Sequence, residues 1–117
     1  MTAEDIRNYA LTKDFVTEGF PFDENNLVFK VGGKIFLIIP LDVVPTTFSV
    51  KTAPAWSEEL REEYWQITGG FHLNKKHWNS VVCDGIRREL ICKLIDHSYD
   101  LVFRSLTKKV RELLTEK

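Results

Sequence analysis

The sequence is poor in several features that mark specialised classes of protein. Its 117 residues include only two cysteines, four prolines and six glycines, which excludes a disulfide-stapled scaffold and a collagen-like or proline-rich chain. The longest apolar run, from Ile35 to Pro40, is far shorter than the roughly 20 residues that cross a bilayer. The first residues lack the basic and apolar pattern of a signal peptide. We therefore expect one cytoplasmic domain over residues 1–117, with no membrane attachment.

The remaining composition is that of an ordinary folded protein. Hydrophobic residues make up 44% and charged residues 28% of the chain. A chain of this length and composition can bury a compact core without disulfides or metal ions. Cys83 falls on an expected strand and Cys92 inside an expected helix, and we expect both to act as small apolar residues rather than as a disulfide. We expect a monomer with no cofactor and no metal.

Charge is distributed unevenly along this near-neutral chain. Residues 1–66 contain 6 Lys and Arg against 11 Asp and Glu, whereas residues 67–117 contain 10 against 6. The basic half includes a polar bend, Asn74-Lys75-Lys76, between two apolar arms. This arrangement predicts a hairpin over residues 67–83 with a basic tip.

A second hairpin is predicted over residues 27–39, where two β-rich runs flank Gly32-Gly33. A two-residue turn there pairs Val31 with Lys34, which puts Lys30 and Lys34 near the tip. The same register predicts one face with Phe29 opposite Phe36 and Leu27 opposite Ile38. It leaves Val28, Ile35 and Leu37 on the other face.

Periodicity predicts helices near residues 3–13, 54–65 and 86–104, a short helix over 108–114, and a strand over 46–51. Residues 17–26 are rich in turn formers and are expected to hold little regular structure. The resulting order, α-β-β-β-α-β-β-α with a short C-terminal helix, predicts an α+β fold with a five-stranded antiparallel sheet and helices packed on it. We expect the core to contain Phe29, Phe36, Ile38, Phe48, Leu60, Phe71, Val81, Leu90 and Leu94.

Four segments together resemble the YjbR/MmcQ family. They are Phe20-Pro-Phe22, the run from Leu27 to Phe36, the run from Gly70 to Val81 that contains His-Leu-Asn-Lys-Lys-His-Trp-Asn, and the run from Leu94 to Val102 that contains Asp-His-Ser-Tyr-Asp. The resemblance covers nearly the whole chain. It implies a small bacterial protein with a helix-flanked antiparallel sheet and a double-wing DNA-binding domain. Thr107 stands where the family commonly has proline before Lys-Lys.

Lysines at two hairpin tips are what a pair of DNA-contacting wings requires. Such lysines neutralise phosphates without reading bases, so they position a duplex rather than select a sequence. The candidate nucleic-acid contacts are Lys30, Lys34, Asn74, Lys75, Lys76, Trp78, Arg104, Lys108, Lys109 and Arg111. Lysines at turns are equally common as solvated residues, and Trp78 is a packing residue unless it stacks on a base.

The histidines and the Asp96–Ser98 segment give only weak evidence of a metal site or a catalytic site. His72 and His77 lack the spacing of a helical zinc motif. Adjacent residues on a helix point about 100° apart, so Asp96, His97 and Ser98 cannot form a triad by themselves. We instead expect His97, Tyr99 and Asp100 to tie the long helix to the basic hairpin. The sequence thus predicts a non-enzymatic DNA-binding module, and the alternative is a protein-interaction module that uses the sheet face of Val28, Ile35 and Leu37.

Overall fold

The computed structural model describes residues 1–70 and 73–116. Its strands form a six-stranded antiparallel sheet in the order β1-β2-β3-β4-β6-β5. The elements are α1 (Ala3–Leu11), β1 (Val16–Gly19), β2 (Asn26–Val31), β3 (Lys34–Pro40), β4 (Thr47–Lys51), α2 (Pro54–Glu63), β5 (Ile67–Gly69), β6 (Trp78–Val82), α3 (Arg88–Ser105) and α4 (Lys108–Thr115). The expected α+β class is confirmed, with one strand more than predicted.

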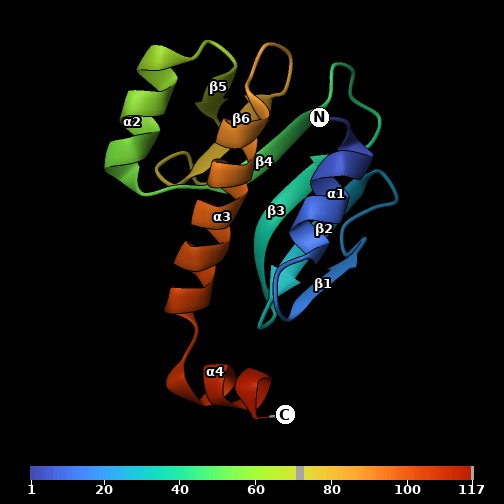
Figure 1. Cartoon of the computed structure of the whole chain (residues 1–117), viewed down its shortest axis with the longest axis vertical. Helices are drawn as coiled ribbons and strands as arrows, with labels where there is room; N and C mark the ends of the chain where they lie inside the picture. Colours follow the sequence, from blue (N-terminus) through green and yellow to red (C-terminus); the bar gives the residue numbers. More distant parts are fainter. Residues whose placement is uncertain (71–72, 117) are drawn as a thin grey trace.

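The helices α1 and α3 lie on one face of the sheet (Figure 1), and α2 packs beside β5. Strand register separates the two faces: Leu37 pairs with Val50 and Phe48 with Val81, and all four side chains are buried on the helix side. The alternate residues Ile38, Ser49 and Ser80 lie on the other side and stay half-buried. We call this second side the open face.

The sixth strand, β1, corrects the expectation of little regular structure over residues 17–26. It pairs with β2, with Val16 opposite Val31 and Gly19 opposite Val28. Its sequence, Val-Thr-Glu-Gly, contains one large apolar residue, so it gives almost no periodic signal. The strand forms because the edge of β2 offers unpaired backbone groups, which is a tertiary cause.

A β-bulge corrects the predicted register of the first hairpin. Val31 pairs with Lys34 as expected, but the register shifts between Phe29 and Lys30, so that Phe29 faces Leu37 instead of Phe36. The extra residue in β3 is Phe36, and both Phe36 and Leu37 are fully buried. A bulge turns consecutive side chains toward one side, which explains why strict alternation misplaces Leu37 and Ile38.

Six of the predicted core residues are buried: Phe29, Phe36, Phe48, Leu60, Val81 and Leu94. Ile38 and Leu90 are only half-buried, because Ile38 lies on the open face and Leu90 at the first turn of α3. Phe71 lies outside the described residues. Threonines cap α1 and α4, since Thr2 accepts a hydrogen bond from the Asp5 N–H and Thr107 from the Val110 N–H. Across the described ranges, no helix has the length and apolarity to cross a membrane.

Candidate nucleic-acid interface

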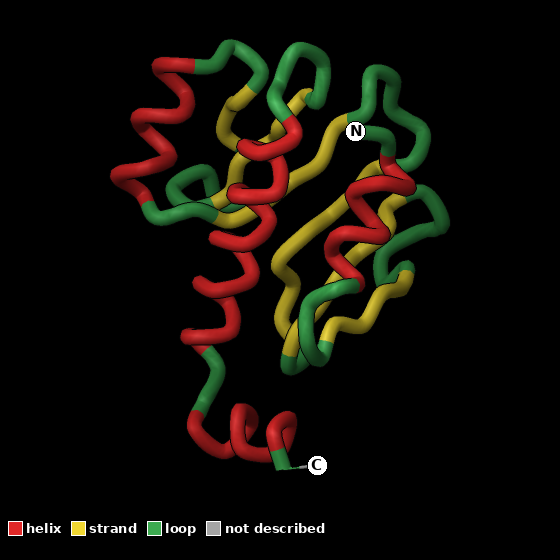
Figure 2. Tube along the Cα trace, viewed as in Figure 1, coloured by secondary structure: helices red, strands yellow, loops and turns green. Residues whose placement is uncertain are grey.

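Alternating strand directions place the two predicted hairpin tips at the same end of the sheet. The β2–β3 turn precedes Lys34 and the β5–β6 loop precedes Trp78, while β3 and β6 run in the same direction on either side of β4. The α3 helix ends beside the β2–β3 turn and leads into α4, whereas the β5–β6 loop lies farther along the twisted sheet, beside the start of α2 (Figure 2). We name this region the basic end, formed by Lys30, Lys34, Lys51, Lys75, Lys76, Arg104, Lys108, Lys109 and Arg111.

Gly32 fixes the first tip against the start of α4. Its φ of +58° belongs to the left-handed region, and a Cβ there would lie 2.6 Å from Cδ1 of Leu106 and 3.1 Å from Cγ1 of Val110. Only glycine fits both the dihedral angle and the space. This contact brings the turn that precedes Lys34 next to the start of α4, which carries Lys108 and Lys109.

The second tip lies between β5, which ends at Gly69, and β6, which begins at Trp78. Asn74 shapes it: the side-chain Oδ1 accepts from the Lys76 N–H at 2.9 Å, and its carbonyl accepts from Trp78 N–H at 2.8 Å. Arg61 of α2 donates to the carbonyls of Lys75 (2.5 Å) and Trp78 (3.2 Å). Asn74 therefore holds the turn, while the Lys75 and Lys76 side chains remain exposed.

The buried side-chain amide of Asn79 also supports this loop. The side chain of Asn79 is fully buried, donates to Thr52 Oγ1 (2.8 Å) and Ser57 Oγ (3.1 Å), and accepts from Arg61 Nε (2.7 Å). Thr52 and Ser57 are also hydrogen-bonded to each other. Buried polar groups need such partners, so Asn79 serves the architecture of the loop rather than contact with a ligand.

Lys51 belongs to the basic end, although it was not among the candidate residues from the sequence. It pairs with Trp78 at the ends of β4 and β6, and both side chains lie half-buried on the open face. Lys30 lies on the same face, opposite Thr17 of β1. The alternation of residues 46–51 predicts that Lys51 points away from the face of Phe48 and Val50. Only the strand order of the folded sheet shows that it lies beside Trp78.

Most cations of the basic end have no acidic partner within the described chain. The exception is Lys108, whose Nζ lies 4.0 Å from Glu112 Oε1, with both side chains well exposed. An exposed pair of this kind stabilises the fold little. The lysines and arginines here are therefore available to an external anion.

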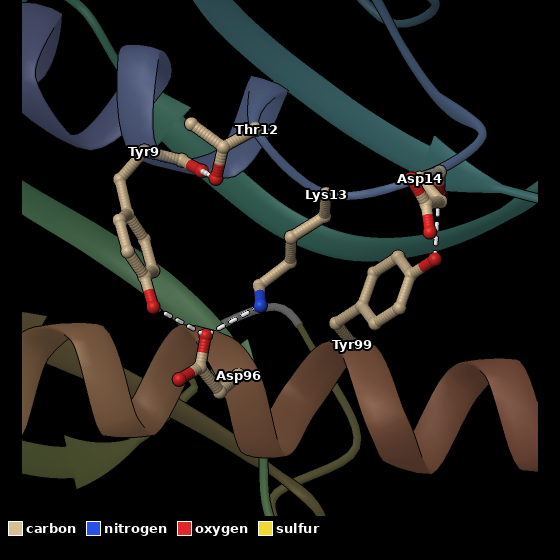
Figure 3. A network of polar contacts seen from close by, with 6 residues as sticks. All are labelled: Tyr9, Thr12, Lys13, Asp14, Asp96 and Tyr99. Atoms are coloured by element: carbon tan, nitrogen blue, oxygen red, sulfur yellow. Dashed lines mark hydrogen bonds and ion pairs between the residues drawn. The ribbon is translucent and has the colours of Figure 1, made fainter.

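The segment from Asp96 to Tyr99 ties α3 to other elements, although not to the basic hairpin as we expected. Asp96 Oδ1 accepts from the Tyr9 hydroxyl at 2.6 Å and pairs with Lys13 Nζ at 2.5 Å (Figure 3). Lys13 Nζ lies over the rings of Tyr9 and Tyr99. The hydrogen bond to Asp96 raises the pKa of Tyr9. Tyr99 donates to the Asp14 carbonyl, so this cluster joins α1 to α3.

The Ser98 hydroxyl takes the place of direct backbone hydrogen bonds between β3 and β4. The ladder between β3 and β4 ends at Leu37 and Val50, so Phe36 and Lys51 would form the next pair. The buried Ser98 hydroxyl instead donates to the Phe36 carbonyl (2.6 Å) and accepts from the Lys51 N–H (2.8 Å). The hydroxyl thereby satisfies both backbone groups where the strands separate. Since Asp96, His97 and Ser98 bond to three different elements, they form no catalytic triad.

His97 positions the start of α2. Its Nε2 accepts from the Ala53 N–H at 3.1 Å, and its ring packs edge-on against Trp56. Burial lowers the pKa of His97, and the accepting nitrogen must stay unprotonated.

Acidification is expected to destabilise the fold through His97. The unfolded imidazole binds a proton near pH 6.5, whereas the folded pKa is lower, so the stability contribution is complete above that value and falls as pH drops through the folded pKa. The test compares urea midpoints near pH 7.5 and 5.5 for the native protein and His97→Gln. We expect a smaller loss in the variant, and equal losses would contradict this role.

Comparison with known proteins agrees with this architecture. The family model described as YjbR matches residues 11–101, the region that holds the sheet and most of α3. The chain belongs to the YjbR family. It is 38% identical to Uncharacterized protein YbdF of Escherichia coli O157:H7, over 91% of this chain and 88% of the relative. It is 28% identical to Uncharacterized protein YjbR of Escherichia coli strain K12, over 99% of each.

Two solved structures share the fold of this YjbR-family chain. Deinococcus radiodurans protein DR2400 superposes with a TM-score of 0.91 at 37% identity, covering 97% of this chain and 88% of the other. A protein from Pseudomonas syringae has a TM-score of 0.74 at 21% identity, covering 87% and 99%, and this second likeness concerns the fold alone. None of these names states a ligand or an activity.

The structure also bears on a metal site, which we did not expect, and on the alternative interaction face. Among the described residues, no three His, Cys, Asp or Glu side chains are grouped as a metal site would require, and His72 lies outside those residues. The alternative interaction face also changes, because Val28 and Leu37 are buried and only Ile35 is half-buried. Leu37 is buried through the β-bulge, which turns it toward the helices.

Proposed function

We propose that this protein is a non-enzymatic module that binds double-stranded DNA through its phosphate backbone, with the basic end as the contact surface. The observation that carries the proposal is the packing of Gly32 against Leu106 and Val110, which joins lysines of the first hairpin to those of α4. Clustered lysines at turns and helix starts suit phosphate contact without base selection.

The β5–β6 loop is the second of the two hairpin tips that a double-wing arrangement needs. The two turns are three strand spacings apart in the sheet order, which is about 15 Å across the strands, and the twist of the sheet separates them further. Tips spaced in this way suit contacts with separate phosphates of one duplex. Trp78 and Lys51 lie on the open face between them.

Removing lysines from the second tip or from the start of α4 is expected to weaken DNA binding without a change of fold. The variants are Lys75→Ala with Lys76→Ala, and Lys108→Ala with Lys109→Ala. Two lost phosphate contacts reduce the salt slope by about 2 and the affinity at least about tenfold near 100 mM salt. The loss should be alike for duplexes of every sequence, because phosphates carry no sequence information. Fluorescence anisotropy with labelled duplexes measures both effects.

Arg87 and Arg88 provide the matched control. They are exposed cations at the start of α3, just as Lys108 and Lys109 begin α4. They follow β6 and therefore lie at the opposite end of the sheet. Arg87→Ala with Arg88→Ala should leave affinity unchanged, and an equal loss in both pairs would show that only net charge matters.

A further inference from the structure

Large apolar side chains are exposed at the end of the sheet opposite the basic end. The loop between β1 and β2 carries Phe20 and Phe22, which are 49% and 66% exposed. The loop between β3 and β4 carries Leu41, Val43 and Val44, which are 47%, 40% and 93% exposed. The two loops touch, since the Leu41 N–H donates to the Asn25 carbonyl at 2.7 Å. These five apolar residues form what we call the apolar loop pair.

A groove on the open face continues from this surface. It has a volume of about 370 Å³, with Phe22 at its rim, Ile38, Pro40 and Leu73 as its apolar lining, and the hydroxyls of Ser49 and Ser80 beside them. That volume is at the lower end of the range for ligand pockets, enough for a few side chains. The groove and the apolar loop pair share Phe22, so one partner could contact both.

The charge on the two loops of the apolar loop pair is of one sign. The segments Gly19 to Phe29 and Ile35 to Val50 contain no lysine or arginine, whereas Asp23, Glu24 and Asp42 lie in the two loops. Asp23 Oδ1 accepts from the Asn25 and Asn26 N–H groups at 2.9 Å each. These bonds lower its pKa, so the carboxylate is ionised at neutral pH. Such a rim repels phosphates and anionic lipid headgroups.

We propose that the apolar loop pair and its groove dock a protein segment that has bulky apolar side chains next to lysines or arginines. The apolar side chains would enter the groove beside Phe22, and the basic ones would meet Glu24 and Asp42. Charge complementarity of this kind selects the partner, while apolar anchors supply affinity. The apolar loop pair lies opposite the basic end, and only the Leu73 side of the groove approaches the β5–β6 loop, so a partner held there leaves the β2–β3 turn and α4 accessible to DNA.

Binding of a model peptide tests the proposal directly. The probe is a synthetic peptide with a central phenylalanine and leucine flanked by lysines, compared with a version flanked by glutamates and a version with serines at the centre. In spectra of the isotope-labelled protein, we expect the first peptide to shift the amide signals of Phe22, Ile38, Leu41 and Val44. Each of the other two should bind at least about tenfold more weakly.

Two exposed aromatic residues make a matched pair of variants. Phe22→Ser should weaken binding of the lysine-flanked peptide at least about tenfold, whereas Trp65→Ser, at a residue 73% exposed outside the surface, should not. The proposal is overturned if all three peptides bind alike or none shifts these signals. It is also overturned if the signals shift on raising protein concentration alone, or on adding phosphatidylcholine vesicles, since a second copy or a membrane would then be the occupant.

Discussion

Truncation of Phe36 to alanine is expected to lower the free energy of unfolding by about 3–5 kcal/mol. The side chain is fully buried, and its ring packs edge-on against Tyr99 with centroids 5.3 Å apart. It occupies the bulge that turns β3 inward, between two strands and α3. Loss of the ring therefore leaves a cavity where three elements meet, and the surrounding backbone cannot collapse freely. Urea denaturation measures the effect as a shift in midpoint.

Phe22→Ala is the control for Phe36, because Phe22 is 66% exposed. We expect a change within about 0.5 kcal/mol, as is usual for surface substitutions. A loss that small at Phe36 as well would contradict the assigned core.

Replacement of Ser98 by alanine is expected to cost about 2–4 kcal/mol, although it removes one oxygen atom. The hydroxyl is the partner of both the Phe36 carbonyl and the Lys51 N–H. Without it, two backbone groups at the separation of β3 and β4 lose their hydrogen bonds in a buried site. Each unsatisfied group costs about 1–3 kcal/mol. Hydrogen exchange of the Lys51 amide should also accelerate more than that of residues elsewhere in the sheet.

Ser105→Ala on the same helix separates this effect from a general loss of serine. The Ser105 hydroxyl donates only to the Val102 carbonyl of its own helix, and the residue is exposed. We expect little change in the unfolding midpoint. Equal effects at Ser98 and Ser105 would show that the hydroxyl bridge is not important.

The elements with strong local signals were predictable from sequence. The Gly32-Gly33 turn, the apolar stripe of α3 and the caps at Thr2 and Thr107 each depend on neighbouring residues. β1 and the bulge at Phe36 were not predictable, because pairing with β2 creates the first and packing against α3 accompanies the second. Tertiary contacts therefore determine β1 and the bulge, which short-range sequence patterns do not specify.

The candidate site was predictable in its residue types but not in its assembly. Lysines at turns could be read from the sequence, whereas the packing of Gly32 on α4 and the pairing of Lys51 with Trp78 needed the fold. Sequence also could not separate contact residues from supporting ones. Asn74 and Asn79 both proved to hold the second loop through hydrogen bonds.

The most direct test of DNA binding by the basic end is the salt dependence of affinity for a duplex. If about four of its lysines and arginines contact phosphates, log affinity against log salt has a slope near −3.6, from about −0.9 per contact. We expect dissociation constants of about 10⁻⁴–10⁻⁶ M at physiological salt, typical of non-specific contacts. Folded protein that shows no duplex binding at about 50 mM salt, or binding that does not change with salt, would contradict the proposed function.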